Sequence, residues 1–117
     1  AGLESFDISP DGDTIAWATT TGKVYTSKAG KTPKFIGYGR DPRWHPEKPQ
    51  LIYAGARMVG NTAVNYDLRI SDANGNGKFL TSTQYSDERW PQWHPKGDQI
   101  IYTINKSTDV FLAEFKQ

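Results

Sequence analysis

The chain has 117 residues, of which 14 are basic and 13 acidic, and its formal net charge is +1. This length fits one domain, and a balanced charge without a basic or acidic block gives no indication of a nucleic-acid partner. Cysteine is absent, which excludes disulfides, thiolate metal sites and cysteine nucleophiles. No run of apolar residues is long enough to span a membrane as a helix.

A repeated pattern organises the sequence. Three segments begin with Ser-Pro or His-Pro, continue through a polar turn and end in two apolar residues and an aromatic one. They are residues 9–17 (SPDGDTIAW), 45–53 (HPEKPQLIY) and 94–102 (HPKGDQIIY). Their prolines lie 36 and then 49 residues apart, a period typical of propeller blades and other stacked units.

Each unit predicts a set of short strands. The first unit predicts strands over residues 14–18, 23–27 and 33–36, after an innermost strand that ends before Pro10. The second predicts strands over 50–54, 67–71 and 78–81, and the third over 99–104 and 109–113. Apolar and polar residues alternate within these segments, and Gly, Pro, Asn and Asp separate them, which is typical of antiparallel hairpins. No segment has the 3.6-residue apolar spacing of a helix, so we expect essentially none.

The motifs SPDGDTIAW, DPRWHPEKPQLIYA and DERWPQWHPKGDQIIYT resemble the repeat of TolB-type β-propellers, whose usual core reads P-x-W-S-P-D-G-x-x-I-A-F. The sequence departs from that core in having His45 and His94 in place of Ser, in lacking Asp-Gly at 47–48, and in having Ile8 where the other units have Trp. The resemblance implies an all-β domain over residues 1–117, built from three four-stranded antiparallel blades at about 1–37, 38–82 and 83–117.

The third unit reaches Gln117 without a fourth strand, so we expect this blade to lack its outer strand. Residues 3–5 could supply the missing outer strand, but this segment is very short for a blade strand. An arc of three blades exposes two large blade faces, and propellers usually have about four to eight blades. Two copies related by a two-fold axis would make six, the blade number of TolB-like propellers, so we expect a homodimer. The alternative is that the chain is a fragment of a longer propeller.

The only histidines, His45 and His94, stand at equivalent places in two units. One interpretation is a metal site or an acid–base pair. The interpretation that we favour is that His replaces Ser at the start of the turn and caps it, so we expect no cofactor. Residues 72–77 match the first half of a calcium loop, but Thr83 at its twelfth position supplies no carboxylate, which favours an Asn-Gly hairpin turn.

Large aromatic residues also recur at fixed places in the repeat. Trp44 and Trp93 precede the His-Pro steps, and Trp17, Tyr53 and Tyr102 share one slot of the second strand. Such residues could stack on a sugar or a peptide. A position that is filled alike in every unit is more typical of architecture, so we expect these rings to pack between neighbouring blades.

Irregular connections between repeats are where binding sites usually lie. The connection over residues 55–65 and the link over 82–89 are longer than their counterparts at 19–22 and 37–40. In propeller topology these two kinds of connection emerge on one face. We therefore predict a ligand-binding loop face formed by Arg40, Asp41, Arg57, Met58, Asn61, Tyr85, Asp87, Glu88 and Arg89. The alternatives are a solvated rim without a ligand, and ion pairs of Arg40, Asp41, Glu88 and Arg89 that join blades.

No catalytic motif is found, because the sequence lacks G-x-S-x-G, H-E-x-x-H and a phosphate-binding glycine loop. The leading hypothesis is a non-catalytic propeller scaffold that assembles into a closed ring and binds a protein, peptide or glycan on its loop face. The alternatives are a lyase or hydrolase-associated domain acting on a carbohydrate or peptide with metal at His45 and His94, and a purely structural ring. The TolB-type resemblance implies an exported bacterial setting, periplasmic or extracellular.

Overall fold

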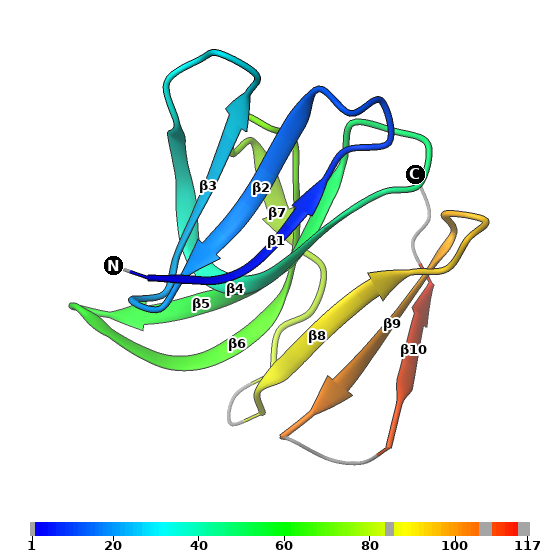
Figure 1. Cartoon of the computed structure of the whole chain (residues 1–117). Helices are drawn as coiled ribbons and strands as arrows, with labels where there is room; N and C mark the ends of the chain where they lie inside the picture. Colours follow the sequence, from blue (N-terminus) through cyan, green and yellow to red (C-terminus); the bar gives the residue numbers. More distant parts are fainter. Residues whose placement is uncertain (1, 84–85, 106–108, 115–117) are drawn as a thin grey trace.

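The computed structural model describes residues 2–83, 86–105 and 109–114. These residues form antiparallel strands and no helix, which confirms the all-β prediction (Figure 1). None of the described segments is therefore a helix of the length and apolarity needed to cross a membrane.

The first blade contains β1 (Leu3–Ile8), β2 (Thr14–Thr19), β3 (Lys23–Lys28) and the first half of β4 (Lys34–Trp44). Each strand pairs antiparallel with the next. Residues 3–5, considered from the sequence as a very short outer strand for the third blade, belong to the innermost strand of blade 1, since Leu3 pairs with Thr19. The outer strand was expected to end at residue 36. It continues as β4, because hydrogen bonding passes from β3 to β5 along one bent strand.

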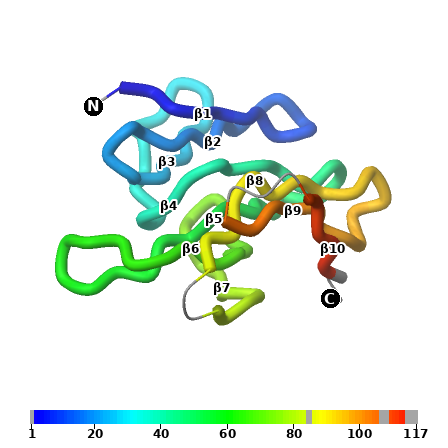
Figure 2. The backbone as a smooth tube through the Cα atoms, turned by 90° about the horizontal axis from the view of Figure 1, so that it is seen from below, coloured from blue at the N-terminus to red at the C-terminus, as the bar shows by residue number. Residues whose placement is uncertain are grey.

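The second blade contains the last part of β4, β5 (Leu51–Val59), β6 (Thr62–Ser71) and β7 (Gly77–Phe79). The connection over residues 55–65 was expected to be a loop, and this was wrong. β5 and β6 stay paired from Leu51↔Ser71 to Val59↔Thr62, so the insertion lengthens the hairpin instead of forming a loop. Figure 2 shows this hairpin extending beyond the rest of the molecule.

The third blade contains β8 (Glu88–Trp93), β9 (Gln99–Ile104) and β10 (Phe111–Glu114), in the order β10-β9-β8. β1, the last part of β4, and β8 are the innermost strands of the three blades, and β4 contacts both β1 and β8. β4 and β8 carry the same bulge. The register shifts between Arg40 and Arg43 and between Arg89 and Gln92, and Asp41 and Trp90 inside these bulges have φ values of 61° and 56°.

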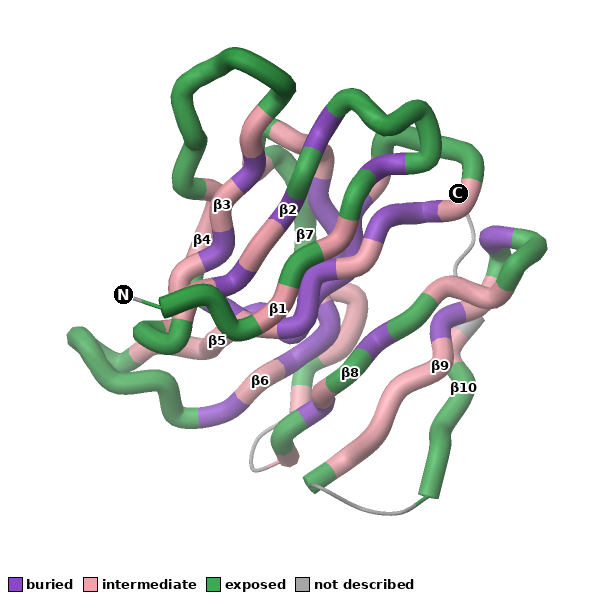
Figure 3. The backbone as a smooth tube through the Cα atoms, in the orientation of Figure 1, coloured by how far each residue is buried: buried purple, intermediate pink, exposed green. Residues whose placement is uncertain are grey.

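The core lies between blades, since strand alternation sends successive side chains to opposite blade faces. We call the side of a blade that faces the earlier blade in the chain its preceding face, and the opposite side its following face. Between blades 1 and 2, the following-face residues Ala16, Ala18 and Val24 pack against Trp44, Leu51 and Tyr53. Between blades 2 and 3, Ile52, Leu68 and Ile70 pack with Ile100, Trp93 and Tyr102. The buried segments in Figure 3 follow these two junctions.

Candidate functional site

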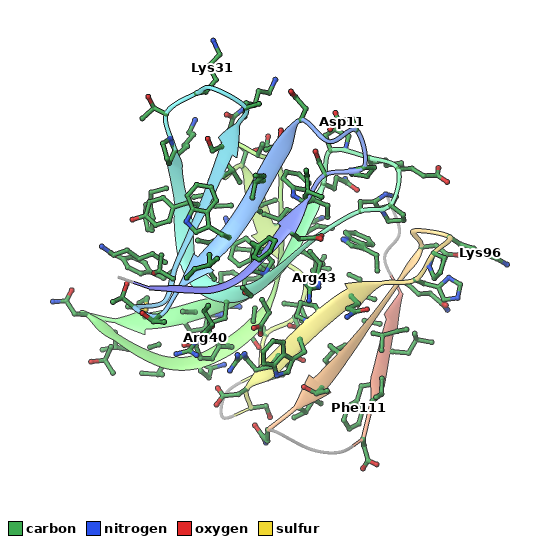
Figure 4. The ribbon with its side chains drawn as sticks, viewed as in Figure 1. Asp11, Lys31, Arg40, Arg43, Lys96 and Phe111 are labelled. Carbon is green, nitrogen blue, oxygen red and sulfur yellow. The ribbon has the colours of Figure 1, made fainter. Side chains whose placement is uncertain are left out.

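The molecule presents two rims at opposite ends of its inner strands. The loop rim comprises the β5–β6 hairpin (56–66), the β2–β3 turn (20–22) and the described parts of the blade links (37–41, 82–83 and 86–90). The turn rim comprises the β1–β2, β4–β5 and β8–β9 turns (9–13, 45–50, 94–98) and the β6–β7 turn (72–76). In Figure 4, Arg40 lies toward the loop rim, while Asp11 and Lys96 lie at the turn rim.

The lengthened hairpin and the link between blades 2 and 3 lie together on the loop rim. The Asn65 side-chain amide donates to the carbonyl oxygens of Thr83 and Ser86, at 2.9 and 3.3 Å. Tyr66 pairs with Asp87, whose carboxylate accepts a hydrogen bond from the Tyr66 amide. The base of the hairpin is therefore fixed to the link.

Arg40 joins the first two blades at this rim. Its guanidinium lies 2.9 Å from the Glu4 carboxylate of β1, and its Nε donates to the Tyr66 hydroxyl at 3.1 Å. Both charged side chains are part-exposed, at 30% for Arg40 and 24% for Glu4. Arg40 thus makes an inter-blade ion pair, the alternative role that the sequence left open.

Asp41 and Arg89 form the corresponding pair between blades 2 and 3. Arg89 donates to both Asp41 oxygens, at 2.6 and 3.1 Å, and the Trp90 amide donates to the same carboxylate at 3.1 Å. Only 1% of the Asp41 side chain and 15% of the Arg89 side chain are exposed. The neighbouring Asp41 carboxylate raises the pKa of Arg89 despite the opposing effect of burial. Arg89 also lies 5.6 Å from the Tyr66 ring centre.

Arg57 is bound within its own blade. Its Nε lies 2.9 Å from the Asp67 carboxylate, its terminal nitrogen donates to the Thr81 carbonyl, and its guanidinium lies 3.6 Å from the Phe79 ring centre. Burial works to raise the pKa of Asp67, but hydrogen bonds from Thr83 and Arg57 hold that pKa below its ordinary value. Arg57 is therefore occupied in fixing the base of the hairpin.

Glu88 is buried at the start of β8, beside Asp67. Its carboxylate accepts hydrogen bonds from the Thr81 hydroxyl and the Leu68 amide. Burial raises the pKa of Glu88, and the nearby Asp67 carboxylate raises it further. With 2% of the residue exposed, Glu88 contributes to the junction between blades 2 and 3 and faces no open site.

The remaining candidates lie on the hairpin and the link. Met58 pairs with Ala63 near the hairpin end, and Asn61 lies exposed in the turn. The neighbouring Val59 and Val64, which the sequence did not single out, are 68% and 57% exposed. Tyr85 lies outside the described residues. The candidate set thus divides into charged residues that are held in ion pairs or hydrogen bonds, and a hairpin end that presents apolar side chains.

The partners of these charged residues were not foreseen. Glu4, Tyr66, Asp67 and Thr81 complete the ion pairs and hydrogen bonds. Glu4 had a usable signal. Its neighbour Ser5 pairs with Ala18 in blade 1 as Arg40 pairs with Ala54 in blade 2, so Glu4 and Arg40 lie at about the same level of adjacent inner strands. Nothing comparable marks Thr81, since its contact depends on how the link folds back over β6.

The histidines have turn roles. His45 Nδ1 accepts hydrogen bonds from the amides of Glu47 and Lys48, and its Nε2 lies 3.0 Å from the Gly97 carbonyl oxygen. His94 Nδ1 accepts from the Lys96 amide at 3.1 Å. No group of three or more His, Asp or Glu side chains that could hold a metal is found in the described part of the chain.

The repeated tryptophans pack and bond between blades, as expected. The Trp44 indole nitrogen donates to the Asp7 carbonyl at 3.2 Å, and the Trp93 indole nitrogen donates to the Arg43 carbonyl at 3.3 Å. Asp7 and Arg43 hold equivalent places on successive inner strands, so the two tryptophans make the same contact at successive junctions.

A groove of about 470 Å³ lies on the turn rim between blades 1 and 2. Its wall includes Asp11, Glu47 and Asp72 together with Lys28 and Lys48. The Asp72 carboxylate accepts hydrogen bonds from the amides of Asn74 and Asn76, which hold its pKa below the ordinary value against the opposing effect of burial. This carboxylate therefore closes a turn, as the Asn-Gly interpretation predicted.

Known structures share this blade arrangement. A structure assigned as TolB from Agrobacterium tumefaciens superposes with a TM-score of 0.72 at 15% identity, over 92% of this chain and 43% of that one. TolB from Acinetobacter baumannii gives a TM-score of 0.66 at 18% identity, over 97% of this chain and 30% of that one. Tricorn protease gives a TM-score of 0.71 at 16% identity, over 92% and 11%.

This is the fold of a TolB-type β-propeller segment. The chain spans less than half the length of each of these structures. No family model matches the sequence, and no curated protein is similar to it. At these identities the likeness establishes the fold alone, and one of the three proteins is a protease by name.

Proposed function

We propose that the chain is a non-catalytic propeller scaffold that joins a second copy of itself to close a six-bladed ring and binds a protein or peptide on its loop rim. The observation that supports ring formation is a difference between equivalent slots of the three blades. On the preceding face, Leu51 and Ile100 are both 0% exposed, while Ile15 in the same slot of blade 1 is 43% exposed. Trp44 is 7% exposed, while Ile8 in its slot is 54% exposed.

The following face of blade 3 shows the same contrast. Thr26 and Ile70 are 3% and 6% exposed between blades, while Leu112 in that slot is 57% exposed. Val24 and Leu68 are both 0% exposed, while Val110 is 63% exposed. Apart from Thr26, these slots hold apolar residues in all three blades, and they are covered wherever a neighbouring blade exists. This supports the proposal that both outer faces contact a blade.

The aromatic content of blade 1 supports the same proposal. Trp17 and Tyr25 stack at 5.7 Å, Tyr25 meets Phe35 edge to face at 5.7 Å, and Phe35 meets Tyr38 at 5.2 Å. This row crosses the preceding face of the first blade. A continuous aromatic surface of this kind is costly to leave in water, so covering it supplies a driving force for association.

The hairpin end supports binding on the loop rim. Its base is fixed by the Arg57–Asp67 pair and by the bonds of Asn65, while Val59 and Val64 beyond that base are exposed. A fixed arm that presents apolar side chains fits a protein or peptide surface better than a glycan, because Arg40, Arg57 and Arg89 at this rim already have carboxylate partners.

The enzymatic alternative has less support. Metal-assisted chemistry at His45 and His94 would require their ring nitrogens to be available, but both nitrogens of His45 are engaged within the turn rim and by Gly97. The proposed setting is periplasmic or extracellular, which rests on the TolB-type resemblance.

Solution mass tests ring formation. Sedimentation equilibrium of the purified chain should give a particle of twice the chain mass that dissociates on dilution. A folded monomer at all concentrations would overturn closure by a second copy, and leaves the preceding blade of a longer chain as the neighbour of blade 1.

Peptide selection tests the loop rim. Peptides selected from a random library on the intact protein should lose about tenfold in affinity when Val59 and Val64 are both replaced by Ser. Lys31→Ser, at the turn between β3 and β4, is the matched control and should have no effect. Selected peptides that bind the double variant equally well would contradict a role for the hairpin.

A further inference from the structure

The turn rim between blades 2 and 3 contains a close contact between a histidine and a glycine. His45 is 3% exposed, and its ring Nε2 lies 3.0 Å from the Gly97 carbonyl oxygen. A Cβ atom at position 97 would lie 2.3 Å from that nitrogen and 2.4 Å from the adjacent ring carbon. Gly97 also has a φ of 76°, a value that glycine adopts without strain. The contact therefore requires a histidine on one blade and a glycine on the next.

The junction between blades 1 and 2 has neither residue. Ser9 stands in the slot of His45, and Lys48 stands in the slot of Gly97. Ser9 uses its hydroxyl inside its own turn, where it accepts a hydrogen bond from the Thr14 amide and donates to Asp11. Where the first blade of a junction has serine instead of histidine, the second blade has lysine instead of glycine. The two slots change together.

The free ends of the arc carry the two halves of the same contact. His94, on blade 3, is fixed by an Nδ1 bond to the Lys96 amide, as His45 is fixed by Nδ1 bonds to Glu47 and Lys48. For His94 Nε2 no hydrogen-bond partner is found among the described residues. Gly12, on blade 1, has a φ of 75°, which matches Gly97, and no atom lies within 4 Å of the Cβ position there.

We propose that the following face of blade 3 docks on the preceding face of blade 1 in a second copy, head to tail, with His94 contacting Gly12 of that copy as His45 contacts Gly97. This inference rests on the proposed ring and adds its direction and its contact. The sequence of blades 1, 2 and 3 then continues with blade 1 of the second copy. Each histidine in the cycle meets a glycine, and the serine meets the lysine.

Head-to-tail docking of blade 3 on blade 1 excludes a dimer in which the two copies of blade 1 meet face to face. In a face-to-face arrangement, the aromatic row of blade 1 would cover the same row of the second copy, and blade 3 would take no part. In the head-to-tail ring, Ile15 and Trp17 receive Ile101 and Val110, as Leu51 and Tyr53 receive Ala16 and Val24 within the chain. Trp90 also enters the contact. It occupies the bulge position of Asp41, which is 2% exposed between blades, while Trp90 is 51% exposed.

The first test replaces each half of the contact. His94→Ser introduces the residue of blade 1 and keeps a side chain that caps the turn, and Gly12→Asn adds a side chain that tolerates positive φ. Each substitution should raise the dimer dissociation constant about tenfold for every His94–Gly12 contact, which gives about a hundredfold for a ring with two such contacts. The controls are His45→Ser, at the internal junction, and Gly30→Asn, where φ is 74° and no atom lies within 4 Å. Both controls should lower the unfolding midpoint and leave the dimer dissociation constant unchanged.

The second test mixes two variants. Ile15→Lys blocks blade 1, and Leu112→Lys blocks blade 3, and each alone should be monomeric at a concentration where the intact chain is dimeric. A mixture should form a heterodimer, because one of its two contacts joins an unmodified blade 3 to an unmodified blade 1. A face-to-face dimer would give a dimeric Leu112→Lys variant and no recovery on mixing, which would overturn the direction.

The outcomes separate this inference from the ring on which it rests. If the intact chain is monomeric, both are overturned. If the intact chain is dimeric but His94→Ser and Gly12→Asn leave its dissociation constant unchanged, the ring survives and the His94–Gly12 contact is overturned. If His94→Ser and Gly12→Asn both weaken the dimer and neither control does, the result supports both the ring and the His94–Gly12 contact.

Discussion

Each of the two internal junctions has an ion pair at the loop rim, with an arginine in the same slot of the repeat. At the loop rim, Arg40 pairs with Glu4 between blades 1 and 2, and Arg89 pairs with Asp41 between blades 2 and 3. The first pair is part-exposed, while Asp41 in the second is 1% exposed and bonds both Arg89 and the Trp90 amide. The arginine of this slot therefore makes a part-exposed contact at one junction and a buried ion pair at the next.

The apolar parts of the junctions also differ, in the opposite sense. Between blades 1 and 2, the small residues Ala16 and Ala18 face Tyr53, which is 0% exposed. Between blades 2 and 3, the larger Ile52 faces Tyr102, which remains half-buried. The first junction depends on close apolar packing and the second on packing with buried charge, and the following predictions test that division.

The largest effect is expected at Tyr53. Tyr53→Ala removes a fully buried ring from the first junction and should lower the free energy of unfolding by about 3–5 kcal/mol, measured by urea titration. Trp17→Ala, in the same slot of blade 1, should cost about 1 kcal/mol or less in the monomer, because no neighbouring blade of the chain covers it. Equal losses in the monomer would contradict the slot comparison.

The next effect separates the two ion pairs. Asp41→Asn leaves Arg89 without its buried partner and should cost about 3 kcal/mol in unfolding free energy. Glu4→Gln removes the part-exposed partner of Arg40 and should cost at most about 1 kcal/mol. In 1 M salt the Glu4 effect should shrink further while the Asp41 effect persists. If the two substitutions cost the same, burial does not distinguish the two junctions.

The sequence predicted the repeat, the strands and the inter-blade roles of Trp44 and Trp93, because each depends on a local pattern that occurs more than once. It misplaced the 55–65 connection, because apolar and polar residues do not alternate regularly over Arg57 to Asn65 and the pairing depends on the partner strand. It assigned Arg40, Asp41 and Arg89 to one loop face, but their pairing depends on bulges at Asp41 and Trp90 that residue type alone does not reveal.

The pH dependence of stability tests the buried charges of the second junction, where two neighbouring carboxylates should act in opposite senses. The pKa of Asp67 is held below 3.8 in the folded chain, so its contribution is present above that value and is lost as the pH falls through the folded pKa. The pKa of Glu88 is raised above 4.5, so its contribution is present below 4.5 and is lost as the pH rises through the folded pKa.

Two isosteric variants measure these contributions. Asp67→Asn should cost more stability at about pH 7 than at about pH 3, where the folded and unfolded carboxyls are both protonated to a larger extent. The free energy of unfolding of Glu88→Gln, relative to that of the wild type, should be higher at about pH 7 than at about pH 4, because the substitution removes a carboxylate that burial disfavours. Unfolding free energies across this range check both, and dependences of the same sign would contradict the assignment.

The smallest effect concerns the outer strands, where blades 1 and 2 again fill one slot differently. Phe35 contacts the rings of Tyr25 and Tyr38, whereas Phe79 in the equivalent slot lies 3.6 Å from the Arg57 guanidinium and 5.0 Å from that of Arg69. Arg57→Lys keeps the charge beside Asp67 but loses the planar contact and the bond to Thr81, and should cost about 1 kcal/mol in urea titrations. Because Arg57 lies 34% exposed at the base of the hairpin, the same variant should also loosen the arm, seen as faster amide exchange over residues 56–66 with blade 1 unchanged. A loss of stability without faster exchange there would mean that Arg57 supports the outer strand alone and that Asn65 is enough to fix the hairpin.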